Sequence, residues 1–213
     1  VVTAVRLKLV SQLSRRTVAL LGLPDIAAAL EVVSRVRSAL PSLAAAEAFF
    51  HEGVDLVCRH AALPAPFPKP AGCYLLLECA SNRDETAELA EVLASCGEVE
   101  ASALATDAAD RQRLWAYRER HTEAINAEGI PHKLDVTLPL ARLPEFEARV
   151  RAAIHAAAPV ARPVLFGHAG DGNLHVNVLG LEPDDETADD AVLRLVAELG
   201  GSISADTLDP SCS

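Results

Sequence analysis

Methionine is absent from this sequence, and aromatic residues make up only 4% of its 213 residues. A core with so few aromatic side chains must be built from Leu, Val and Ala. The sequence also lacks an apolar run near the roughly 18 residues that a helix needs to span a bilayer. Its first ten residues alternate like a strand and do not have the form of a signal peptide. We therefore expect no transmembrane segment.

Positive charge is scarce as well. Nineteen Lys and Arg residues stand against 30 Asp and Glu residues, which gives a formal net charge of −11. A nucleic-acid surface needs a clustered positive footprint, so this composition argues against nucleic acid as a partner. The five cysteines are odd in number and form no Cys-x-x-Cys, so no zinc-binding spacing is present. Reduced, mostly buried cysteines fit a cytoplasmic protein.

Strand and helix patterns alternate along the chain, as judged from apolar periodicity and from helix start and stop signals. The predicted strands are 1–10, 17–23, 43–50, 73–80, 99–105, 133–138, 163–168 and 174–179. The predicted helices are 24–40, 54–60, 84–96, 107–128, 143–158 and 185–199.

A proline-rich loop, 63–72, is the clearest internal joint, and the alternation restarts after it. Two similar halves of this kind predict an α+β fold of duplicated ferredoxin-like antiparallel sheets, with helices packed on one face. A doubly wound nucleotide-binding sheet fits less well, because no glycine-rich phosphate loop follows any strand. The run Ala-Gly-Asp-Gly-Asn at 169–173 precedes a strand, so its glycines are interpreted as turn residues.

Two histidines flank this run in the stretch "FGHAGDGNLHVNV". If its two strands pair as a simple antiparallel hairpin, His168 lies opposite His175, with Cβ atoms about 5 Å apart. Two imidazoles at that separation can share one metal ion at roughly 2.0–2.1 Å per nitrogen. Period-two alternation puts Asn177 on the same face as His175. Two turn-flanking histidines that are satisfied by backbone groups are the alternative, and the spacing alone leaves it open.

The motif "GHAGDGNLHVNV" resembles the C-terminal domain of FAD-linked oxidases. The relevant branch includes D-lactate dehydrogenases, D-2-hydroxyglutarate dehydrogenases and the flavin subunit of bacterial glycolate oxidase. Three further segments resemble the family in order and spacing: "LWAYRERHTEAI" at 114–125, "HKLDVTLPL" at 132–140 and "ELGGSISA" at 198–205. By this resemblance, 1–10 is the last strand of a flavin domain, 11–205 is the C-terminal cap domain, and 206–213 is a tail foreign to the family.

The resemblance implies roles for individual residues. His168 and His175 match the family's ligands of a divalent metal, which we expect to be zinc or manganese. A substrate-binding set is implied at Arg118, Thr122, Lys133 and Asn177. An arginine suits a substrate carboxylate because its planar fork binds both oxygens. A 2-hydroxy acid can chelate a metal through its carboxylate and hydroxyl, which polarises the hydroxyl.

The residues alone also allow simpler interpretations. Arg118 could be one charge in the solvated run "RERHTE". Lys133 could be an exposed edge residue, or it could pair with Asp135, which shares its strand face. Asp171 lies where a loop carboxylate commonly caps a turn, and it receives no metal role.

The match to the family ends after Ala205. The family continues with a glutamate that completes the metal site and a histidine that acts as the general base, whereas this chain has Asp206 and Thr207. Asp206 could still bind the metal through its shorter arm, but Thr207 cannot take a proton from a substrate at neutral pH. No catalytic base is therefore assigned. The domain that would hold FAD is expected to be missing upstream, so the hydride acceptor lies outside this chain.

We therefore expect the substrate- and metal-binding domain of an FAD-dependent D-2-hydroxy acid dehydrogenase, inactive by itself. The intact enzyme would oxidise a 2-hydroxy acid to a 2-oxo acid and pass the hydride to FAD. The expected partners are a small 2-hydroxy acid and the flavin domain of the same protein, and two copies could form a homodimer. Two other functions stay open. One is a metal-binding, ferredoxin-like regulatory module without redox activity, and the other is a metal-dependent hydrolase, for which the hairpin offers only Asp171 as a base.

Overall fold

The computed structural model describes residues 4–7 and 12–203. Its strands are β1 (Arg15–Leu23), β2 (Leu43–Phe49), β3 (Cys73–Ser81), β4 (Ala101–Leu104), β5 (His132–Thr137), β6 (Arg162–His168), β7 (Asn173–Leu179) and β8 (Ser202–Ile203). Its helices are α1 (Ile26–Ala39), α2 (His51–Ala61), α3 (Thr86–Ala94), α4 (Ala108–Glu119), α5 (His121–Glu128), the 3₁₀ turn η1 (Leu140–Arg142), α6 (Leu143–Ala157) and α7 (Thr187–Glu198).

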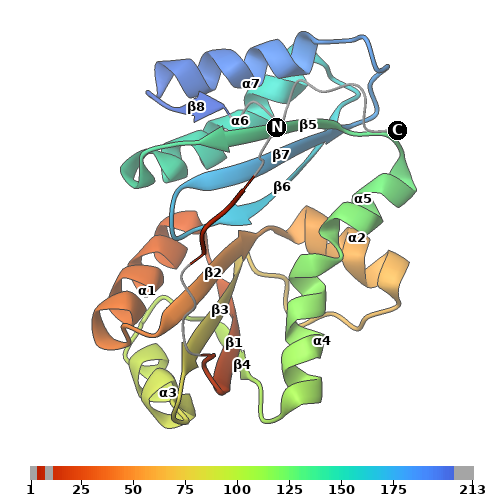
Figure 1. Cartoon of the computed structure of the whole chain (residues 1–213). Helices are drawn as coiled ribbons and strands as arrows, with labels where there is room; N and C mark the ends of the chain where they lie inside the picture. The colour runs from red at the N-terminus through yellow and green to blue at the C-terminus, as the bar shows by residue number, and fades with distance from the viewer. Residues whose placement is uncertain (1–3, 8–11, 204–213) are drawn as a thin grey trace.

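The strands of the described part form one antiparallel sheet of eight, in the order β4-β1-β3-β2-β6-β7-β5-β8. The first four strands have the order 4-1-3-2, and the last four repeat it in the opposite direction. Each group follows the β-α-β-β-α-β plan of a ferredoxin-like unit. The two units meet where β2 pairs with β6, and Figure 1 shows one unit above the other. The predicted duplicated ferredoxin-like α+β fold is confirmed.

Local sequence explains how the first unit begins. β1 carries the run Thr17–Leu23, which is buried throughout because the strand lies between β3 and β4 and has helices on both faces. Pro24 and Asp25 then end the strand. The Asp25 carboxylate accepts a hydrogen bond of 2.8 Å from the backbone N–H of Ala28, so it caps the first turn of α1. The second unit uses Pro144 in the first turn of α6, where its missing N–H costs nothing.

Helices cover both faces of the sheet, which corrects the expectation that they pack on one face. The helices that belong to the two ferredoxin-like units, α1, α3, α6 and α7, pack over the larger core on one side. The additional helices α2, α4 and α5 cover the other side over a second core that includes Phe49, Tyr74 and Phe166. These additional helices stand together on one flank of the molecule in Figure 1.

The structure differs from the sequence prediction at three segments. The proline-rich loop 63–72 lies inside the first unit, because β3 returns to pair between β1 and β2. The boundary between the units therefore falls at α4 and α5. The helix predicted over 107–128 is two helices, with a turn at Arg120. In the predicted strand 1–10, residues 4–7 form no strand, and the other residues lie outside the described part.

Two further expectations concern composition. Of the residues described, no helix is both long and apolar enough to cross a membrane. Cys58, Cys73, Cys79 and Cys96 are free, and the last three are buried, as expected.

Candidate active site

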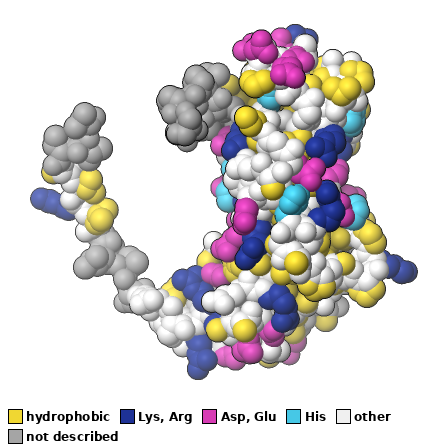
Figure 2. Space-filling view, turned by 90° about the vertical axis from the view of Figure 1, so that its right-hand side faces the viewer, with side chains coloured by type: hydrophobic (Ala, Val, Ile, Leu, Met, Phe, Trp, Pro, Cys, Tyr) yellow, Lys and Arg dark blue, Asp and Glu magenta, His cyan; other side chains and the backbone are white. Residues whose placement is uncertain are grey.

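The middle of the sheet carries polar side chains on the face that α2, α4 and α5 cover. Directly paired residues of neighbouring strands share a face. Glu47 of β2 pairs with His168 of β6, and Asp135 of β5 pairs with His175 of β7. Figure 2 looks onto the flank that carries these helices, and basic, acidic and histidine side chains run across its middle. A polar site therefore lies where the two ferredoxin-like units join.

The register of the histidine hairpin differs from the prediction by two residues. His168 pairs with Asn173, and His175 pairs with Phe166, because the loop between β6 and β7 has four residues. His168 and His175 are consequently diagonal neighbours and not direct partners. They still share a face, and their ring centroids are 5.6 Å apart. The two rings are thus brought together as expected, although by a different pairing.

Each of the two histidines is held by a carboxylate. Nδ1 of His168 lies 2.7 Å from Oε1 of Glu47, and Nδ1 of His175 bonds Oδ1 of Asp135. Since a carboxylate only accepts, the Nδ1 atom of each ring donates. Within the described residues no hydrogen bond engages Nε2 of either ring. The interpretation of these histidines as satisfied by backbone groups is therefore wrong.

This arrangement fits part of a metal site. Metal-binding histidines commonly donate their second ring nitrogen to a carboxylate, which fixes the tautomer and leaves the other nitrogen for the metal. His168 and His175 both meet this condition. No group of three or more His, Cys, Asp or Glu side chains able to hold a metal occurs among residues 4–7 and 12–203. Asp206 and Thr207 lie outside the described residues, so the donor set within the described part consists of two imidazoles.

A cavity of about 310 Å³ lies beside His175. All four residues of the expected substrate-binding set line it, although each comes from a different helix or strand. Its lining is Arg118 and Thr122 from α4 and α5, Lys133, Leu134 and Asp135 from β5, Phe166 from β6, and His175 and Asn177 from β7. Lys133 and Thr122 are exposed, whereas Asn177 is buried and donates to the backbone carbonyl of Val164 at 3.5 Å. The fold thus collects every one of these side chains at one hollow.

Arg118 is fixed from two sides. Its Nε donates to Oε2 of Glu47 at 2.8 Å, and its guanidinium lies over the ring of Phe166, with 4.5 Å from Cζ to the centroid. The side chain is only 14% exposed, so it is not one charge in a solvated run. In the described part no hydrogen bond occupies its two terminal nitrogens. These terminal N–H groups are the ones that a planar carboxylate would bind.

The charges at the centre stabilise one another. Burial alone would raise the pKa of the Glu47 carboxyl, but the hydrogen bond from His168 and the positive charge of Arg118 outweigh it and lower that pKa. Glu47 is therefore a carboxylate at neutral pH. The hydrogen bond to Glu47 raises the pKa of His168, against the opposing effect of burial.

His121 lies beneath this site and is 1% exposed. Its Nδ1 donates to the backbone carbonyl of Arg118 at 3.1 Å, at the turn that separates α4 from α5. Its ring lies between those of Phe49 and Phe166, with centroid distances of 5.3 and 5.0 Å. The Nε2 atom is buried without a hydrogen-bond partner among the described residues. Burial, and then the charge of Arg118, lower the pKa of His121 to about 3.

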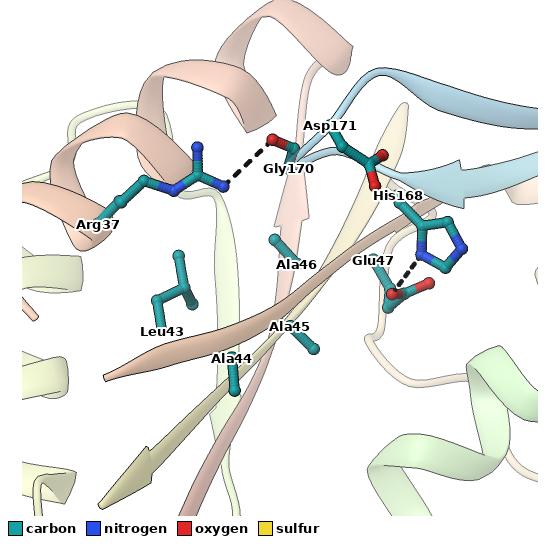
Figure 3. A pocket seen from close by; sticks show the side chains of 9 residues that line it. All are labelled: Arg37, Leu43, Ala44, Ala45, Ala46, Glu47, His168, Gly170 and Asp171. Atoms are coloured by element: carbon teal, nitrogen blue, oxygen red, sulfur yellow. Dashed lines mark hydrogen bonds and ion pairs between the residues drawn. The ribbon is translucent and has the colours of Figure 1, made fainter. Parts of the chain in front are cut away.

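A second cavity, of about 240 Å³, lies on the other side of His168 (Figure 3). β2 forms one wall with residues 43–47, and the hairpin loop forms another with Gly170 and Asp171. Arg37 of α1 reaches across and donates to the carbonyl of Gly170 at 3.2 Å. Asp171 accepts from the backbone N–H of Asn173 at 3.1 Å, as expected for a carboxylate that caps its turn.

Glu47, which joins Arg118 to His168, was not predicted from the sequence. A signal was present, since Glu47 is the single charged residue of the strand "LAAAEAF" and such an isolated carboxylate needs partners when buried. Asp135 does share a face with Lys133, but its hydrogen-bond partner is His175.

Comparison with known proteins gives the family. The FAD linked oxidases, C-terminal domain, match residues 12–206. The chain is 36% identical to a D-2-hydroxyglutarate dehydrogenase of Xanthomonas citri pv. viticola, over 89% of this chain and 42% of that protein. It is 37% identical to the mitochondrial D-2-hydroxyglutarate dehydrogenase of Bos taurus, over 84% of this chain and 33% of that protein. The chain thus spans less than half the length of these curated relatives. Since the second is named as mitochondrial, the expected cytoplasmic location stays a prediction.

Solved structures agree on the fold. Alkyldihydroxyacetonephosphate synthase matches with a TM-score of 0.60 at 10% identity, over 90% of this chain and 40% of that one. A p-cresol methylhydroxylase matches with a TM-score of 0.59 at 11% identity, over 90% of this chain and 45% of that one. With the family match over almost the whole chain, these likenesses lead to one conclusion: this protein belongs to the C-terminal domains of FAD-linked oxidases.

Proposed function

We propose that this chain is the substrate- and metal-binding domain of an FAD-dependent D-2-hydroxy acid dehydrogenase, and that its acid is D-2-hydroxyglutarate. The supporting observation is the 310 Å³ cavity, which gathers Arg118, Lys133 and His175. Two cations on one small hollow suit a molecule with two carboxylates. The names of the first two relatives above point to the same acid.

Each residue of the cavity would make a different contact with the acid. Arg118 would take one carboxylate in its two terminal N–H groups, because Glu47 already holds its Nε. Lys133 would take the second carboxylate as a point charge. Asn177 and Thr122 would offer further, uncharged hydrogen bonds, and Phe166 would form the apolar floor beneath Arg118. Closing water out of such a hollow strengthens every charged contact within it.

Two further groups would supply the chemistry. FAD, on a separate flavin domain, would accept the hydride, and a divalent metal, zinc or manganese, would polarise the substrate hydroxyl. His168 and His175 would hold the metal through Nε2, with Asp206 as a third ligand. No residue of the described part is assigned as the base.

The first test is metal content. The purified chain is dialysed against zinc or manganese and analysed by elemental mass spectrometry, beside a His168→Ala/His175→Ala double variant. We expect about one metal ion per chain in the wild type and none in the double variant. His155→Ala, which changes an exposed histidine of α6, is the matched control and should keep the metal. A wild-type chain without metal would contradict the metal part of the proposal.

The second test is acid binding by calorimetry. D-2-hydroxyglutarate should bind the metal-loaded chain, and Lys133→Met should weaken it about tenfold or more, since one charge-assisted hydrogen bond contributes about 1.5–3 kcal/mol. D-lactate has one carboxylate, so its binding should not respond to Lys133→Met. The regulatory module predicts instead that metal affinity is indifferent to both acids, and that result would favour it over the proposal.

A further inference from the structure

We propose that Glu47 is a positioning residue that couples Arg118, where the substrate carboxylate binds, to His168, where the metal binds. This inference rests on the proposed function and deepens it. It concerns a residue that touches neither acid nor metal. Its role would be to make the two halves of the site respond to each other.

The geometry of Glu47 supports this coupling. The residue is 7% exposed, and each carboxylate oxygen has its own partner. Oε1 accepts from Nδ1 of His168 at 2.7 Å, and Oε2 accepts from Nε of Arg118 at 2.8 Å. Within the described residues no hydrogen bond joins Arg118 directly to His168. The carboxylate of Glu47 is therefore the shared group between them.

Both partners require an acceptor at this position. Nε of arginine always carries a hydrogen. His168 must also keep its hydrogen on Nδ1 if Nε2 is to present a lone pair to a metal. A carboxylate accepts on both oxygens, so it satisfies both donors at once. No neutral side chain of the same shape can do so.

Glutamine in place of Glu47 tests this requirement. It has the size of glutamate, but its amide has one acceptor, the oxygen, and one donor, the nitrogen. If the amide nitrogen faces His168, that ring must move its hydrogen to Nε2 and loses its metal-binding lone pair. If the nitrogen faces Arg118, two donors meet and the guanidinium loses its anchor. Glu47→Gln therefore cannot keep both halves of the site in place.

The two oxygens also belong to one rigid plane. Any shift of the carboxylate that improves one hydrogen bond changes the direction of the other. Loss of Arg118 should therefore alter the metal affinity at His168, although Arg118 is not a ligand. Loss of Arg118 should have no such effect through Glu47 once Glu47 itself has been replaced. A double-mutant cycle of Glu47 and Arg118 tests this expectation.

The experiment measures zinc affinity by calorimetry on the full chain without any acid. The four proteins are the wild type, Glu47→Gln, Arg118→Met and the double variant. Glu47→Gln should weaken zinc by about 10–100-fold, as loss of a carboxylate that orients a metal ligand usually does. The charge of Arg118 acts on the metal in both backgrounds, so it cancels in the cycle. We expect the two single effects to combine non-additively by at least about threefold, and additivity within about twofold would overturn the proposal.

Two controls keep the result interpretable. Glu78→Gln changes another carboxylate of the sheet that bridges two donors, Arg16 at 2.8 Å and Trp115 at 2.9 Å, and it should leave zinc affinity within twofold. Glu47→Asp keeps an acceptor-only group that is too short to reach both partners, so a cycle built with Glu47→Asp in place of Glu47→Gln should show the same non-additivity even if Glu47→Gln fails to fold. A wild-type chain that binds neither zinc nor manganese would contradict the metal part of the proposed function and overturn this inference with it. Wild-type binding with additive variants would overturn the inference alone.

Discussion

The buried His121 gives the fold a specific sensitivity to acid. In the folded chain burial, aided by the nearby charge of Arg118, holds the pKa of His121 at about 3. In the unfolded chain the same imidazole has an ordinary pKa of about 6.5. The unfolded state therefore binds one more proton than the folded state between these two values. The contribution of neutral His121 to the free energy of unfolding is present in full above pH 6.5 and is lost as the pH falls toward 3.

The size of the effect at pH 5 follows from these values. One pKa unit corresponds to about 1.4 kcal/mol, so lowering the pH from 7 to 5 should cost the folded chain about 2 kcal/mol through His121. This figure requires only that His121 stays neutral at pH 5 in the folded state. His132 and His168 have raised pKa values and act in the opposite direction.

The assay compares urea unfolding of the wild type and His121→Asn at pH 7 and pH 5. Asparagine does not titrate, and its amide can still donate toward the carbonyl of Arg118. The free energy of unfolding should fall by about 2 kcal/mol more in the wild type than in the variant over this interval. His132 and His168 are present in both proteins, so their effects cancel. His155→Asn, at an exposed position, should behave like the wild type.

Equal pH dependence in the wild type and His121→Asn would refute this reasoning. It would mean that the folded chain admits a proton to His121 at pH 5, so that burial does not keep the ring neutral.

Two other predictions concern the neighbours of His121. Gly53→Ala should destabilise the chain by about 1–3 kcal/mol, because overpacking a core costs that much and the new Cβ would lie 2.3 Å from Nε2 of His121. Gly97→Ala, where no atom lies within 4 Å of the new Cβ, is its control, and both are measured as midpoints of urea unfolding. Arg118→Lys should weaken D-2-hydroxyglutarate binding by about tenfold or more, since a lysine cannot replace a bidentate guanidinium. In calorimetry Arg113→Lys, on the same helix and paired with Asp110 at 2.8 Å, should bind like the wild type.

Much of the fold could be predicted because its signals are local. The buried run of β1 and the Asp25 cap of α1 are each encoded within a few neighbouring residues. Pairing between distant strands is not encoded this way. The proline-rich loop at 63–72 therefore indicated a boundary, whereas the chain after it returns into the first unit as β3.

The site was predictable to a similar extent. The motifs predicted roles for Arg118 and His175, which line one cavity, and alternation correctly placed Asn177 on the face of His175. The exact pairing of the hairpin depended on its loop length, which spacing alone does not fix. Glu47 could not be connected to His168 because 121 residues separate them in the chain. Only the pairing of β2 with β6 brings them together.

The pairing of β2 with β6 also decides when the polar site can form. The joint between the two units consists of three residue pairs, Glu47 with His168, Ala48 with Gly167 and Phe49 with Phe166. One unit supplies Glu47, and the other supplies both histidines and Asp135, so neither copy of the duplicated motif carries a complete set. A slip of one residue along this joint would turn Glu47 to the opposite face of the sheet. The site therefore exists only when the two units are joined. It forms only if β2 and β6 pair in the correct register.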